Sequence, residues 1–76
     1  MTWREKVQTL LPAEKRVYDL MLLGKSTKEI ANELFLAYST IKNHKTSILK
    51  KLGVKNSKEV IIFYYEDQIR QLKESK

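Results

Sequence analysis

The sequence contains no cysteine, one histidine, two glycines and one proline in 76 residues. Without cysteine the chain has neither a disulfide bond nor a cysteine-ligated zinc site, and a reducing compartment, the cytoplasm, is expected. His44 alone cannot form a multi-histidine metal centre, and two separated glycines cannot form a glycine-rich loop around a phosphate. We therefore expect neither a metal ion nor a cofactor.

The chain also lacks a long apolar segment. Its longest apolar run, from Val60 to Tyr65, is far shorter than the roughly 20 residues that cross a membrane. The first residues, Met1 to Lys6, lack the apolar centre of a secretory signal. A chain of this length accommodates a single domain, taken as residues 1–76, without a core large enough for an active-site pocket. We expect no membrane partner and no enzyme activity.

Acidic residues are absent from the middle of the chain. The segment from Leu34 to Lys58 holds six lysines and no acid, whereas the rest of the chain carries nine basic and nine acidic residues. The whole net charge of +6 thus lies in one segment, as expected of a protein that presents one positive face to a polyanion. We interpret this positive face as a binding surface for nucleic acid. A membrane surface, an acidic protein partner or a lysine-rich surface without a partner are the alternatives.

Pro12, Gly24 and Gly53 divide the chain into segments of helical length. Proline suits the first position of a helix and glycine its end, so a helix is predicted over about 12–23. Its apolar stripe is expected to contain Val17, Leu20, Met21 and Leu23.

Ser26 and Glu29 have the spacing of a capping box and predict a short helix over about 27–35. Its apolar positions are Ile30, Ala31, Leu34 and Phe35. After a brief connection, a longer helix is predicted over about 39–52, with its apolar positions at Ile41, Ile48, Leu49 and Leu52. The opposite side of this helix carries Asn43, Thr46, Ser47 and Lys50, flanked by Lys42 and Lys51. The pair has the pattern of a helix-turn-helix, whose second helix enters the major groove of DNA.

The final segment is predicted as a helix over about 57–72, capped by Asn56. The run Val60 to Tyr65 is rich in strand-forming residues, but no second strand is present to pair with it. Residues 2–9 are expected to form a short turn or helix, with Trp3, Val7 and Leu10 over one end of the core. The predicted fold class is all-α.

Six ordered blocks of the sequence resemble the LuxR-type (GerE/NarL) DNA-binding domain, in its small standalone form, over about residues 10–65. They are Leu10-Leu-Pro-Ala-Glu14, Gly24, Lys28-Glu-Ile-Ala31, Leu34-Phe35, Thr40-Ile-Lys-Asn-His44 and Leu49-Lys-Lys-Leu-Gly-Val54. The resemblance implies a four-helix bacterial transcription-regulator domain that binds double-stranded DNA. It also implies that 28–35 is the scaffold helix, that 39–52 is the recognition helix, and that the last helix joins two copies in a homodimer.

The resemblance further implies roles for individual residues. Bases would be read by Lys42, Asn43 and Thr46. The DNA backbone would be contacted by Lys28, Thr40, Lys45, Lys50 and Lys51. From the helical wheel, Val60, Ile61 and Tyr64 would face the domain, and the dimer contact would consist of Ile62, Tyr65, Ile69 and Leu72. The alternative is that the amino-terminal segment around Trp3 covers this apolar arc.

Two helix starts depart from the family pattern, because Leu11 and Ala37 stand where capping Thr and Ser are common. Thr9 or Ser39 would then act as a shifted cap. Many relatives carry an amino-terminal receiver or ligand domain, whereas about ten residues precede the match here. If the chain is complete, regulation is expected through its abundance, a protein partner or dimerisation. The competing function is an antagonist that forms heterodimers with a related regulator.

Overall fold

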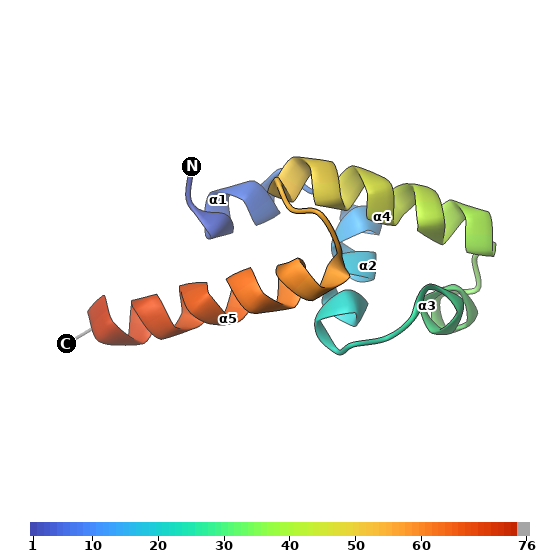
Figure 1. Cartoon of the computed structure of the whole chain (residues 1–76). Coiled ribbons are helices and arrows are strands. Elements are labelled where there is room, and N and C mark those ends of the chain that lie inside the picture. Colours follow the sequence, from blue (N-terminus) through green and yellow to red (C-terminus); the bar gives the residue numbers. More distant parts are fainter. Residues whose placement is uncertain (75–76) are drawn as a thin grey trace.

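The computed structural model describes residues 1–74, and within them the chain forms five helices and no strand (Figure 1). The helices are α1 (Trp3–Gln8), α2 (Pro12–Leu22), α3 (Thr27–Leu34), α4 (Tyr38–Leu52) and α5 (Ser57–Glu74). The all-α fold class is therefore confirmed. The strand-forming run Val60 to Tyr65 lies inside α5 and is helical, since no partner strand exists for it.

One apolar core joins the last four helices. Its buried side chains are Val17, Tyr18, Met21, Ile30, Ala31, Ile41, Ile48, Leu52 and Val60. Helix α4 lies across α2 and α3 and supplies three of these residues, while α5 packs on α2 and on the end of α4. Helices α3 and α4, with the short turn between them, form a helix-turn-helix (Figure 1).

Local side-chain bonds begin and end these helices where the sequence suggests. The Glu29 N–H donates to Ser26 Oγ at 3.2 Å, and the Ser26 N–H donates to Glu29 Oε1 at 2.8 Å, which completes a capping box at α3. At the start of α5, Asn56 Oδ1 accepts a hydrogen bond from the Glu59 N–H at 3.0 Å. Gly53 ends α4 with φ of 69°, a conformation that favours glycine.

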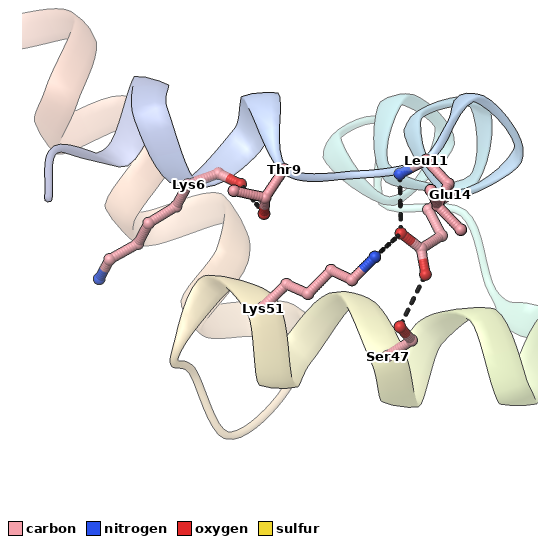
Figure 2. Close-up of polar contacts among 6 residues, drawn as sticks. All are labelled: Lys6, Thr9, Leu11, Glu14, Ser47 and Lys51. Carbon is pink, nitrogen blue, oxygen red and sulfur yellow. Dashed lines mark hydrogen bonds and ion pairs between the residues drawn. The ribbon is translucent and has the colours of Figure 1, made fainter.

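The proposed shifted caps are wrong. Thr9 closes α1 instead of opening α2, because its hydroxyl donates to the Lys6 carbonyl at 2.6 Å (Figure 2). Leu11 occupies the N-cap position of α2, and Ala37 occupies that of α4 without a side-chain bond. Ser39 lies inside the first turn of α4.

Two residues expected on apolar stripes are exposed. Helix α2 ends at Leu22, so Leu23 lies beyond its packed face. Phe35 is outside α3, where it adopts a left-handed conformation with φ of 57°, and its side chain is 93% exposed. Helical periodicity does not apply to residues beyond the end of a helix, which explains both errors.

Helix α5 has one face on the domain and another in solvent. Val60 is buried, while Ile61 and Tyr64 are half-buried. On the open side, the exposed apolar stripe of α5 contains Ile62, Tyr65, Ile69 and Leu72, which are 48%, 55%, 53% and 70% exposed. Trp3 contacts Phe63 with ring centroids 6.0 Å apart, so the amino-terminal segment does not cover this stripe. No helix within residues 1–74 is long and apolar enough to cross a membrane.

Candidate nucleic-acid interface

One face of α4 points away from the core and carries hydrogen-bonding side chains. Ile41, Ile48 and Leu52 anchor the opposite face and are fully buried. The exposed residues include the three predicted base readers and one predicted phosphate contact: Lys42, Asn43, Thr46 and Lys50. Thr46 Oγ1 donates to the Lys42 carbonyl at 3.1 Å, so its hydroxyl lies against the helix backbone. We call this surface the open face of α4.

Ser39 belongs to the open face, although sequence reasoning treated it only as a cap. It is exposed and precedes Asn43, Thr46 and Lys50 by four, seven and eleven residues, which places all four on one line along the helix. The signal was present in the helical spacing. It was missed because Ser39 was assigned as the N-cap, whereas the N-cap is Ala37 and Ser39 lies in the first turn.

The open face is positive and lacks neighbouring acids in the sequence. No acidic residue occurs between Leu34 and Lys58. The ammonium groups of Lys42, Lys50 and Lys28 have no hydrogen-bond or ion-pair partner in the part of the chain that the structure describes, and all three residues are exposed. These cations are therefore available to an anion such as phosphate.

Lys45 has a partner within the protein. Its Nζ donates to Thr27 Oγ1 at 2.9 Å and so connects α4 with the start of α3. The residue is half-buried, as are Thr40 and His44 beside it on α4. The stem of Lys45 packs between the two helices of the helix-turn-helix while its charge stays at their common edge.

Glu14 connects α2 with α4 through a buried carboxylate (Figure 2). Its Oε1 accepts from Lys51 Nζ at 2.7 Å and from the Leu11 N–H at 2.9 Å, and its Oε2 accepts from Ser47 Oγ at 2.6 Å. Glu14 is only 3% exposed. Ser47 therefore faces α2, not the open face where the helical wheel placed it, and the Lys51 ammonium is already paired.

These contacts also keep Glu14 ionised. Burial alone would raise the pKa of its carboxyl, but the hydrogen bonds from Lys51, Ser47 and the Leu11 N–H lower this pKa from 4.5 to about 2. At neutral pH the carboxylate thus binds one side of α4 to the scaffold, and the other side is presented to solvent. Glu14 precedes the buried Val17, Tyr18 and Met21 by three, four and seven residues, which places it on the buried face of α2. A buried carboxylate needs hydrogen-bond or ion-pair partners.

The structure thus divides the predicted site residues into two groups. Lys28, Lys42, Asn43 and Lys50 are exposed, and their charges or amide have no bonding partner within residues 1–74. Lys45 and Lys51 instead bond to Thr27 and Glu14. Among residues 1–74, no cluster of His, Asp and Glu side chains could hold a metal ion. The surface offers donors and positive charge, which are suited to base edges and phosphates.

The chain is similar in sequence to known bacterial regulatory proteins. Over 53 residues the chain is 40% identical to the spore germination protein GerE of Bacillus subtilis, covering 70% of this chain and 72% of GerE. Over 52 residues it is 48% identical to the transcriptional regulatory protein DesR of Bacillus subtilis, covering 68% of this chain but only 26% of DesR.

A solved structure and a family pattern agree with these relatives. The structure of the response regulator StyR superposes with a TM-score of 0.77 at 28% identity, over 84% of this chain and 32% of the StyR chain. The sequence pattern of bacterial regulatory proteins of the luxR family matches residues 8–64, which include the helix-turn-helix and its open face. This match covers more than half of the chain and confirms the resemblance carried by the sequence blocks. The protein therefore belongs to the luxR family of bacterial regulatory proteins.

Proposed function

We propose that this protein regulates transcription by binding a specific sequence of double-stranded DNA as a homodimer, with α4 in the major groove. The observation that carries the proposal is the open face of α4, which combines exposed amide, hydroxyl and ammonium groups on a helix fixed from behind by the core and Glu14. The relatives named as transcriptional regulators support it. The cytoplasm, where bacterial DNA lies, matches the absence of cysteine.

Base reading falls to the middle of the open face. A helix about 10 to 12 Å across fits a major groove about 12 Å wide. Asn43 can pair with adenine through its amide donor and acceptor, Lys42 can reach guanine, and Thr46 can contact a base edge or a thymine methyl group. Ser39, one helical turn before Asn43, extends the same line towards the helix start, the part that contacts bases in helix-turn-helix proteins.

Phosphate binding falls to the cations at the edges of this surface. Lys50 continues the open face, and Lys28 lies exposed in the first turn of α3. Thr40 adds a hydroxyl in the first turn of α4. Lys45 and Lys51 contribute positive potential while their ammonium groups remain bonded to Thr27 and Glu14.

The exposed apolar stripe of α5 supplies the dimer contact in this proposal. A two-fold axis would bring the stripes of two copies together and place two α4 helices about one DNA turn, roughly 34 Å, apart. A heterodimer with a related regulator could use the same stripe, which is why the antagonist function remains the alternative. An antagonist has no need of the positive open face of α4.

Selection of bound sequences from random duplex DNA at a stated salt concentration tests the proposal. A dimeric reader enriches a site made of two half-sites related by two-fold symmetry. Enrichment of a single half-site would contradict the homodimer. If no sequence is enriched although the protein is folded, sequence-specific DNA binding is wrong and the antagonist is favoured.

A further inference from the structure

The far half of α5 extends beyond the domain core. The first turns of the helix are anchored by Val60, Ile61 and Tyr64, which are buried or half-buried. Beyond them, the residues of α5 are exposed except for Asp67 and Gln71. The helix is 18 residues long, about 27 Å, so roughly half of its length projects from α2 and α4 (Figure 1).

Helix α1 lies against α5 at the point where α5 leaves the core. The Trp3 ring contacts the Phe63 ring with centroids 6.0 Å apart. Thr2 and Arg4 line a hollow together with Asp67 and Gln71, the two partly covered residues. Helix α1 therefore lies against one face of α5 between Phe63 and Gln71.

The same helix is fixed to the core at a second point. Trp3 Nε1 donates to the hydroxyl of Tyr18 at 3.1 Å, and Tyr18 is a buried residue of α2. One side chain, Trp3, thus connects the projecting helix with the scaffold of the DNA-binding surface. Lys6 of α1 also lies beside Gly53, where α4 ends.

The α1 contact and the proposed dimer contact lie on opposite faces of α5. Phe63, Asp67 and Gln71 recur every four residues on one face, while the exposed apolar stripe of α5 runs along the other. In a dimer, the projecting half of α5 would therefore be held between α1 of its own chain and the α5 helix of the second copy. Both α1, up to Val7, and the end of α5 after Tyr64 lie outside the matched family pattern.

We propose that α1 is a brace, with Trp3 as its positioning residue, that fixes the angle of α5 and thereby the half-site spacing that the dimer accepts. The inference rests on the proposed homodimer. A small change in the angle of α5 produces a large displacement at a distance. A tilt of about 10° moves a point about 20 Å away by about 3.5 Å, close to the rise of one base pair. A loosened α5 would let the two α4 helices reach sites of several spacings.

The test uses the full chain and duplexes that carry the selected half-site once, or twice with the spacing changed by up to two base pairs. The parent is expected to bind one spacing about tenfold more tightly than the others, because both half-sites are engaged only when the geometry matches. Trp3→Ala should keep its affinity for the single half-site within about twofold, and its preference among spacings should fall to about threefold or less.

Two further variants complete the design. Phe63→Ala removes the ring partner of Trp3 on α5 and should give the same loss of spacing preference; since Phe63 is 42% exposed, this variant carries the test if Trp3→Ala does not fold by circular dichroism. Gln8→Ala, on the exposed side of α1, is the matched control and should behave as the parent.

The outcomes separate the two proposals. If a folded Trp3→Ala or Phe63→Ala keeps the full spacing preference, the brace is wrong. Equal loss of affinity for the single half-site and for every double site would also overturn it, because Trp3 would then support only the fold. A parent protein that gains nothing from a second half-site contradicts the homodimer itself, before any variant is examined.

Discussion

At the scale of single residues, Glu14 connects α4 with α2. It is a buried carboxylate with three donors, and its ion pair with Lys51 joins α2 to α4 (Figure 2). Its folded-state pKa lies below the ordinary value, so the interaction stabilises the protein fully above about pH 4.5 and is lost as pH falls towards 2.

Glu14→Gln should therefore reduce the acid sensitivity of folding. The lowered pKa corresponds to about 3 kcal/mol at neutral pH, of which about 2 kcal/mol is lost by pH 3. Urea unfolding at pH 7 and pH 3 measures this. We expect the variant to be less stable than the parent at pH 7 and to lose less stability between the two pH values. The remaining carboxyls are common to both proteins, so an equal loss would contradict the assignment.

Lys50 and Lys51 are neighbours with different predicted roles. Lys50→Ala should make the salt dependence of DNA binding shallower by about 1.8 in log affinity against log salt, because a dimer loses two phosphate contacts. Lys51→Ala should instead lower the free energy of unfolding by about 1 to 3 kcal/mol, because Glu14 loses its charged partner. Binding at several salt concentrations and urea unfolding of both variants separate the effects. Identical profiles for the two would contradict this division.

The open face was predictable at this scale and the Glu14 contacts were not. Asn43, Thr46 and Lys50 lie opposite the apolar positions on a helical wheel, which predicts their exposure from sequence alone. The wheel places Ser47 on the same side and Lys51 at its flank, but both side chains bond Glu14 of α2 instead. The direction of their side chains was fixed by α2, whose position the sequence does not specify.

At the scale of elements, the start of α4 is weakly capped. Ala37 has the extended backbone of an N-cap residue, with φ of −67° and ψ of 148°, and makes no side-chain bond. Ala37→Ser should therefore stabilise the protein by about 0.5 to 2 kcal/mol. The urea midpoint measures this gain. Ser39→Ala is the matched control and should leave the midpoint almost unchanged; a large loss there would show that Ser39 caps the helix instead.

Helix positions were largely predictable because particular residues mark the helix boundaries. Pro12, Ser26 and Gly53 each specify a helix boundary through local chemistry. The errors fall where that chemistry is missing, at Ala37 and at Phe35, whose left-handed backbone is held by the turn between α3 and α4. The prediction that Trp3, Val7 and Leu10 pack over the core is confirmed, whereas the contact between Trp3 and Phe63 of α5 needed tertiary information.

At the scale of the whole molecule, the proposed homodimer forms through the exposed apolar stripe of α5. Ile62→Glu and Tyr65→Glu should each give a monomer, because a charge would be buried in the contact between two copies. Both side chains are about half exposed in the single chain, so the fold should be retained. Sedimentation measures the assembly. Folded variants that associate as the parent does would rule out this interface.

The division between base reading and phosphate binding is the central claim, and one titration tests it most directly. Parent and Asn43→Ala are titrated at fixed salt onto the selected site and onto a scrambled duplex of equal length. We predict that Asn43→Ala loses about 1 to 3 kcal/mol per lost base contact on the selected site and almost nothing on the scrambled duplex. Equal losses on both duplexes, or no loss on either, would contradict base reading by the open face of α4.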